Sequence, residues 1–132
     1  ANGIALDQDA GVIYVAVLEQ GTIVAIPVMD DGSAGEPTVY ARFEGLALPD
    51  GLAIGEDGTL YAAQPGVNTI SRGTTDGTVE IVASGGDLDG PASVTVGPEG
   101  DVLYAANFSA ALAGIVPPNG AGSGVVMISL ED

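Results

Sequence analysis

Three versions of one pattern recur along the 132-residue chain, and this repeat limits the possible folds more than any other feature. They read "ANGIALDQDAGVIYVAV" from residue 1, "PDGLAIGEDGTLYAAQ" from residue 49 and "PASVTVGPEGDVLYAAN" from residue 91. Their starts therefore lie 48 and 42 residues apart. Each version has an apolar run, an acidic glycine turn and a second apolar run that carries Tyr14, Tyr61 or Tyr104. Periods of this length are typical of stacked supersecondary units.

The apolar runs within each repeat predict short antiparallel strands. They are rich in Val, Ile and Tyr, and Asp-Gly or Glu-Gly turns separate them, which is a strong hairpin signal. We expect strands at 3–6, 12–18, 22–28 and 38–43 in the first repeat, and at 51–55, 59–64, 69–73 and 79–84 in the second. Four antiparallel strands every 40 to 50 residues predict an all-β fold made of propeller blades.

The third repeat predicts three strands where four are expected. They cover 93–97, 102–107 and 125–130, so this blade lacks its outermost strand. We expect one domain over 1–132 with blades at 1–48, 49–90 and 91–132. Because a closed ring needs at least four blades, three blades leave apolar faces and a strand edge uncovered. The expected partner is a second half-propeller, either another polypeptide or a copy of this chain.

The charge balance limits the other partners. Eighteen acidic residues stand against Arg42 and Arg72, and the formal net charge is −16. Such a surface repels phosphate backbones and anionic lipid headgroups, so we expect neither nucleic acid nor a membrane surface as a partner. Cations are favoured, although the acidic residues also fit a role in solubility alone. The acidic, lysine-free composition favours an extracellular location, and an Ala start fits either a processed form or a piece of a longer protein.

Two missing residue types narrow the chemistry. The chain has no Cys and no His, which excludes disulfides, thiolate chemistry, serine-histidine triads and His-ligated metals. Carboxylates, amides and hydroxyls remain, and these are the ligands of hard cations such as calcium.

Asn2 and Asp50 occupy the same place in consecutive repeats. In a propeller they lie where adjacent inner strands begin, at one end of the channel. An amide oxygen and a carboxylate there form a partial shell for a divalent cation. The third repeat offers Ser93, or Ala92 by strict register. The alternative is that Asn-Gly and Asp-Gly are only turn dipeptides that bond their own backbone.

"ANGIALDQDAGVIYVA" followed by "PDGLAIGEDGTLYAA" resembles the senescence-marker-protein/gluconolactonase family of six-bladed propellers, also called regucalcin-like. The resemblance covers the whole chain but only the C-terminal half of the family's propeller. It implies that Asn2 and Asp50 are metal ligands and that Asp50 is the general base. The family completes the site with a Glu and an Asn from blades that this sequence does not contain.

The function implied by this resemblance is metal-dependent lactone hydrolysis, with calcium as the expected cation. Asp50 takes the proton of the attacking water, and we expect the isolated chain to be inactive. The alternative is a non-catalytic scaffold, in which half-propellers assemble into oligomers or filaments by strand addition.

Three further patterns have structural interpretations. "DDGSAGE" at 30–36 lacks the spacing of an EF-hand loop and predicts a hairpin, as do the other acidic glycine turns. The recurring tyrosines predict packing between blades. "NFS" at 107–109 matches an N-glycosylation sequon, which leaves modification of Asn107 open.

Overall fold

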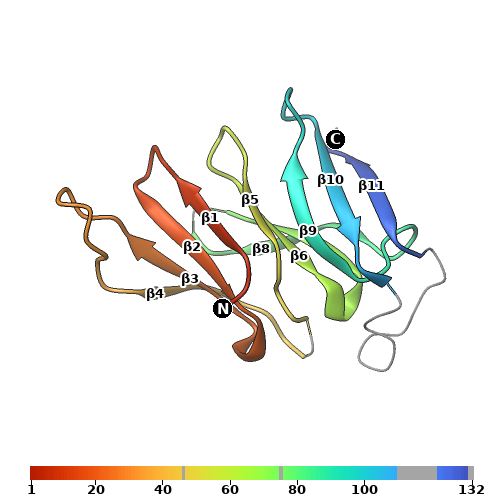
Figure 1. Ribbon diagram of the computed structural model, residues 1–132, viewed down its shortest axis with the longest axis horizontal. Coiled ribbons are helices and arrows are strands. Elements are labelled where there is room, and N and C mark those ends of the chain that lie inside the picture. Colours follow the sequence, from red (N-terminus) through yellow and green to blue (C-terminus); the bar gives the residue numbers. More distant parts are fainter. Residues whose placement is uncertain (46, 75, 110–121, 131–132) are drawn as a thin grey trace.

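Three antiparallel sheets stand side by side in the protein (Figure 1). The structure is a computed structural model that describes residues 1–45, 47–74, 76–109 and 122–130. No helix in these ranges is long and apolar enough to cross a bilayer. Each sheet is formed by one sequence repeat, in the strand order of the chain.

The first two sheets have four strands each. The first contains β1 (Ile4–Asp7), β2 (Val12–Val17), β3 (Thr22–Pro27) and β4 (Thr38–Arg42). The second contains β5 (Leu52–Ile54), β6 (Leu60–Gln64), β7 (Thr69–Gly73) and β8 (Val79–Ser84). One-turn 3₁₀ helices, η1 (Leu18–Gln20) and η2 (Pro65–Val67), join the second and third strands of these sheets.

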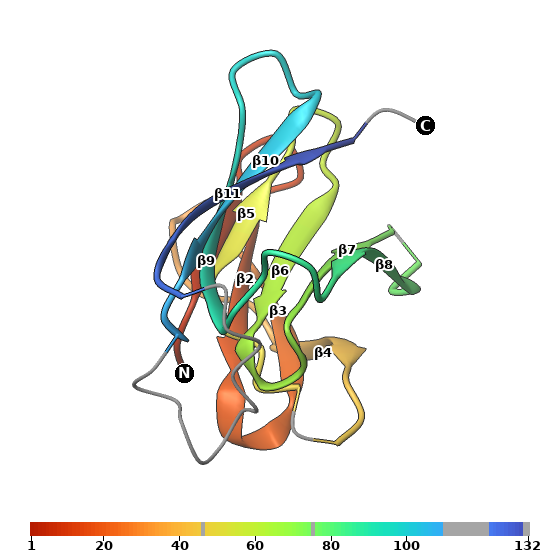
Figure 2. The same cartoon turned by 90° about the vertical axis from the view of Figure 1, so that its right-hand side faces the viewer.

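The third sheet contains β9 (Pro91–Val96), β10 (Val102–Asn107) and β11 (Gly124–Ser129), with β11 at its outer edge. These three strands are the ones that the sequence predicts, and no fourth strand joins them within the described ranges. Figure 2 shows this sheet at the front of the molecule, with no other described strand drawn over its face. The predicted fold, a three-blade half of a six-bladed propeller, is confirmed.

Acidic glycine turns close the hairpins as predicted. Gly58 and Gly100, in the turns before β6 and β10, have φ of 79° and 75°, a region that glycine enters without the steric cost of a Cβ. In the turn before β6, Asp57 accepts hydrogen bonds from the backbone and hydroxyl of Thr59. The hydrogen bonds that close this turn are therefore local to the hairpin.

Two apolar clusters hold the three sheets together. Between the first and second sheets, Ile23 and Ala41 pack with Leu60 and Ala62. Between the second and third sheets, the buried residues are Tyr61, Ala63, Ile70, Leu88, Val94, Leu103 and Ala105. Full burial of one side chain such as Ile70 contributes about 1.5–3 kcal/mol relative to exposure. The core thus lies between blades, and each blade depends on its neighbour.

The recurring tyrosines pack between blades only where a neighbouring blade is present. Tyr14 lies against the first cluster, with its ring 5.0 Å from that of Tyr40 in an edge-to-face arrangement. Tyr61 is 6% exposed, whereas Tyr104 is 37% exposed. The predicted packing between blades is thus observed for Tyr14 and Tyr61, whereas no described blade covers the face of the third sheet on which Tyr104 lies.

Candidate functional site

The starts of the three inner strands β1, β5 and β9 meet through backbone hydrogen bonds. The N–H of Gly3 donates to the carbonyl of Asp50 at 3.1 Å, and the N–H of Gly51 donates to the carbonyl of Ala92 at 2.9 Å. Within its own blade, Asp50 donates from its N–H to Ala63 at 2.9 Å. These bonds place Asn2 and Asp50 at the starts of adjacent inner strands, as the repeat predicts.

Glycine is required at this end because the inner strands nearly touch. A Cβ on Gly51 would lie 2.6 Å from the Cα of Ser93 and 2.7 Å from the carbonyl oxygen of Ala92. A Cβ on Gly3 would collide with the carbonyl group of Asp50. Distances under 3.0 Å to backbone atoms leave no room for a side chain. The glycines of the Asn2-Gly3 and Asp50-Gly51 pairs therefore allow adjacent inner strands to approach closely, in addition to any role in a turn.

The carboxyl group of Asp50 is partly desolvated, and this changes its pKa. Burial raises the pKa of its carboxyl above the ordinary value of 3.8, since desolvation disfavours the charged form. The side chain is half-buried. Across the described ranges, its carboxylate receives neither a hydrogen bond nor an ion pair. Asn2, its neighbour in the ring, is exposed.

The third repeat adds no side-chain oxygen at the equivalent position. The same hydrogen bond that joins Gly3 to Asp50 joins Gly51 to Ala92, so Ala92 is the counterpart of Asn2 and Asp50. Of the two candidates that the sequence left open, Ala92 and not Ser93 has this place. Asn2 and Asp50 fit two positions of an oxygen shell, which is fewer than the six to eight ligands that calcium takes. No group of three or more Asp, Glu, Cys or His suited to a metal occurs in the described part of the chain.

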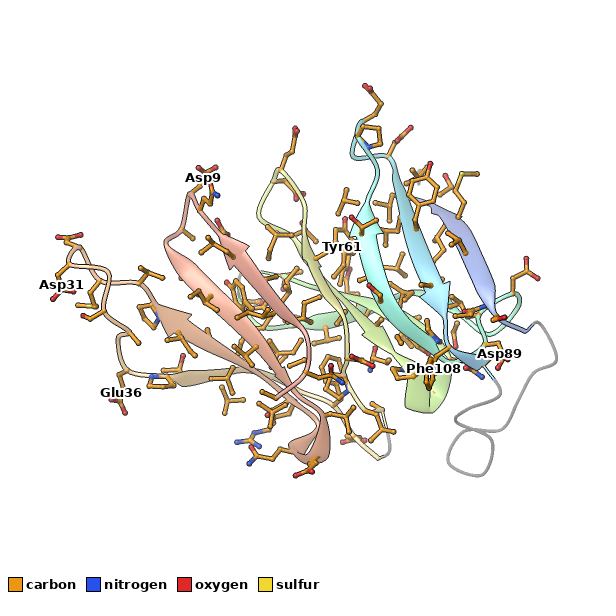
Figure 3. The ribbon with its side chains drawn as sticks, in the orientation of Figure 1. Asp9, Asp31, Glu36, Tyr61, Asp89 and Phe108 are labelled. Atoms are coloured by element: carbon orange, nitrogen blue, oxygen red, sulfur yellow. The ribbon has the colours of Figure 1, made fainter. Side chains whose placement is uncertain are left out.

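The opposite end of the sheets is strongly acidic, and its carboxylates act in turns. Asp31, Asp57 and Asp76 accept hydrogen bonds from Ser33, Thr59 and Thr78 two residues further on. These bonds hold the pKa of the Asp31 and Asp57 carboxyls below the ordinary value. The Thr74 hydroxyl, together with Thr78, holds the pKa of Asp76 at about 2. Figure 3 shows Asp9 and Asp31 at such hairpin tips, away from the strand starts. The hairpin interpretation of "DDGSAGE" is confirmed by the isolated bridge between Val28 and Ala34.

A groove of about 560 Å³ lies between the first hairpins of blades one and two. Tyr14 and Tyr40 line its apolar part, and Asp7, Asp9, Glu56 and Asp57 are among its acidic residues. Sequence reasoning missed this groove because it forms between two hairpins about 48 residues apart that come together only through blade packing. It lies at the end of the sheets opposite Asn2 and Asp50.

Asn107 is part of a hydrogen-bond network that anchors the loop before β9. Its side-chain nitrogen donates to the carbonyls of Asp87 at 2.8 Å and Gly122 at 3.2 Å, and its oxygen accepts from the N–H of Asp89 at 3.0 Å. Asp89 in turn accepts from the Ser109 hydroxyl at 3.1 Å. The side chain that the sequon would modify is therefore engaged in the folded protein.

The three antiparallel sheets and their paired inner strands are those of a β-propeller. Residues 1–108 match the family model described as the SMP-30/gluconolactonase/LRE-like region. The chain belongs to this family, as the sequence motifs suggested.

Solved structures show the same fold at low identity. A gluconolactonase from Xanthomonas campestris matches with a TM-score of 0.76 and 16% identity, over 96% of this chain and 43% of its own. A luciferin-regenerating enzyme matches with a TM-score of 0.74 and 21% identity, over 98% of this chain and 44% of its own. A chain of a nidogen/laminin complex matches with a TM-score of 0.75 and 21% identity, over 97% of this chain and 43% of its own.

The chain thus spans less than half the length of each of these three proteins. Two of them carry the names of enzymes and one was solved in a protein complex, so the shared fold alone does not assign a reaction.

Proposed function

We propose that this chain supplies Asn2 and Asp50 to a divalent-cation site, most naturally for calcium, in a lactone-hydrolysing propeller. The observation that carries the proposal is the Asp50 carboxylate, which is half-buried, raised in pKa and without a described hydrogen-bond donor or counterion. A carboxylate that loses hydration on folding without gaining a partner destabilises the folded protein in its charged form. A hard cation beside the amide oxygen of Asn2 removes that penalty.

The chemistry follows from the same two residues. When bound, the cation supplies Lewis-acid polarisation of the lactone carbonyl. Asp50 accepts a proton from the attacking water, whose oxygen adds to the carbonyl carbon. The ring C–O bond then breaks, and the ring oxygen leaves as a hydroxyl after it takes up the proton that Asp50 holds, which returns Asp50 to the carboxylate.

The small residue at position 92 suits this proposal. Ala92 stands beside Asp50 in the ring and offers no ligand, so it leaves that side of the channel end open to a substrate. In the assembled protein, the remaining cation ligands come from blades beyond those described.

Two measurements on the protein as isolated, with any chain that copurifies, test the function. Calorimetric titration with calcium is expected to show binding that weakens at least tenfold in Asp50→Asn and in Asn2→Ala. Hydrolysis of a gluconolactone, followed by acid release, is expected to fall about 10²–10⁴-fold in Asp50→Asn. Asp57→Asn is the matched control, because Asp57 lies in a hairpin at the other end of the sheets. Unchanged calcium binding in Asp50→Asn would refute the site.

A further inference from the structure

The groove of about 560 Å³ lies between the tips of the β1–β2 and β5–β6 hairpins. Its volume is within the range of about 300–1,000 Å³ that is usual for small-molecule sites. Asp7 reaches across from the first hairpin, because one of its carboxylate oxygens lies 3.4 Å from the position of a Cβ on Gly58. The groove is therefore a defined space between two blades, and every residue that lines it is described by the structure.

One wall of the groove is aromatic and is held in place by the fold. The ring of Tyr14 meets that of Tyr40 edge to face, with 5.0 Å between the ring centroids. The Tyr40 hydroxyl donates a 2.5 Å hydrogen bond to the carbonyl of Thr74. The Tyr40 ring also lies 2.9 Å from the position of a Cβ on Gly73. The two rings therefore keep their orientation without a ligand.

Packing between blades does not require this pair of rings. Tyr40 is the bulge residue of β4, because it is skipped in the pairing with β3. The residue skipped at the same place in β8 is Val82, and the junction between the second and third sheets packs without a second tyrosine ring. Bulges often re-aim a side chain beside a functional site. Tyr40 is thus available to shape the groove.

The groove is also negatively charged. Asp9 and Glu56 line it and are exposed, and among the described residues neither receives a hydrogen bond or an ion pair. The charge of Asp7 reaches the aromatic wall, because it adds to the effect of burial in raising the pKa of Tyr14. A positively charged group in the groove would therefore be attracted from both hairpins.

Neither of the two basic residues of the chain lines the groove. Arg72 contributes to the low pKa of Asp57, but its side chain forms an ion pair with Glu80 at 2.9 Å. Arg42 lies at the end of β4 and is not among the lining residues. A ligand must therefore supply the positive charge that matches these carboxylates.

We propose that this groove binds a small organic cation, in which an ammonium or guanidinium group is joined to an apolar body. Carboxylates in turns would by themselves attract only hydrated ions, whereas here they surround a ligand-sized groove with an aromatic wall. The charged group lies among the carboxylates of Asp7, Asp9 and Glu56, and the apolar body packs on Tyr14. A cation within about 6 Å of a ring centroid is attracted further by the ring quadrupole.

Saturation-transfer NMR with phenethylammonium tests the site on the protein as isolated, because this method detects weak binding whatever the size of the assembly. The probe carries one positive charge and one phenyl ring. We expect it to bind at least tenfold more tightly than 2-phenylethanol, which has the ring without the charge. Ammonium, which has the charge without the ring, is expected to displace the probe only at concentrations at least tenfold higher than that of the probe.

Two variants test where the probe binds. Tyr14→Leu is expected to raise its dissociation constant about fivefold through loss of the ring. Asp9→Asn combined with Glu56→Gln is expected to raise it about tenfold, and these exposed side chains can be changed even if Tyr14→Leu fails to fold. The matched control is Asp30→Asn combined with Glu36→Gln, which removes the same number of charges from the connection between β3 and β4. Figure 3 shows Glu36 well away from Asp9.

Several outcomes would overturn the proposal. Equal weakening by the control pair would mean that the probe follows only the net charge of −16. Equal binding of 2-phenylethanol, equal displacement by ammonium, or no binding of phenethylammonium would each refute an organic-cation site. An arginine-bearing peptide that binds the groove when phenethylammonium does not would make it a protein interface instead. Asp50→Asn is expected to leave probe binding unchanged, so failure of the groove and failure of the calcium site are separate results.

Discussion

The backbone N–H of Gly3 donates a 3.1 Å hydrogen bond to the carbonyl oxygen of Asp50, across the junction between the first two sheets. This bond joins the residue after one candidate ligand, Asn2, to the other candidate ligand itself. The positions of Asn2 and Asp50 are therefore coupled through main-chain atoms, which move less than side chains. The backbone at both positions is therefore held in place by contacts within the chain.

Asp50→Asn is expected to stabilise the metal-free protein at neutral pH. Burial raises the folded pKa of Asp50 above 3.8, so ionisation costs stability as pH rises through the interval between 3.8 and that higher folded value. Removal of the charge relieves this cost at pH 7 and has no effect below pH 3.8. Thermal melting in chelator at pH 7 and pH 3.5 measures the difference between variant and parent.

Asp57→Ala is the control for that prediction, because it is expected to lower the melting temperature at pH 7 where Asp50→Asn raises it. Hydrogen bonds from Thr59 lower the pKa of Asp57, so its ionised form stabilises the fold at neutral pH. The variant is expected to melt below the parent at pH 7. Equal behaviour of both variants at pH 7 would contradict the electrostatic difference between the two ends of the sheets.

Gly51→Ala is expected to disrupt the junction between the second and third sheets. The new Cβ meets backbone atoms of Ser93 and Ala92 at 2.6 and 2.7 Å, and such overpacking costs about 1–3 kcal/mol. Hydrogen exchange followed by NMR should show reduced protection of the residue-51 amide, whose bond to Ala92 is displaced. Gly86→Ala is the control: it strains a turn residue with φ of 60°, but its Cβ meets no atom within 4 Å, so protection at residue 51 should persist.

Tyr40→Phe is expected to weaken the contact between the outer strands of blades one and two. The Tyr40 hydroxyl donates a 2.5 Å hydrogen bond to the carbonyl of Thr74, and loss of one such bond costs about 1 kcal/mol. Desolvation, with smaller contributions from Tyr14 and Asp76, raises the pKa of Tyr40 to about 12. The parent therefore loses stability as pH rises from 10 to 12, and the variant should lose less. Urea unfolding at pH 7 and pH 11 measures both effects.

Thr74→Val is expected to raise the pKa of Asp76. The Thr74 hydroxyl donates a 2.5 Å hydrogen bond to the Asp76 carboxylate and is the largest cause of its low pKa of about 2. An NMR titration of the Asp76 carboxyl carbon should give a midpoint closer to 3.8 in the variant than in the parent. The stability that the ionised Asp76 carboxylate contributes is lost as pH falls from 3.8 to about 2. A parent protein in which Asp76 titrates near 3.8 would contradict the hydrogen bonds of this turn.

The sequence by itself determined the strands and their turns. Hairpins such as that around Asp57 and Gly58 depend on hydrogen bonds within a few residues and on a glycine at positive φ. The turns also predicted which strands are neighbours, because a short turn places consecutive strands side by side and antiparallel. Asn2 and Asp50 were identifiable for the same reason, since they hold one place in consecutive repeats.

Only the tertiary structure decided how the blades meet. It showed that Ala92 holds the third ring position, that Tyr104 is exposed and Tyr61 is buried, and that an acidic groove separates two hairpins. It also showed that Gly3 and Gly51 are required by the close approach of inner strands. The physical reason is that burial and contact between blades join residues far apart in the sequence, such as Gly3 and Asp50 or Tyr40 and Thr74, which no local pattern specifies.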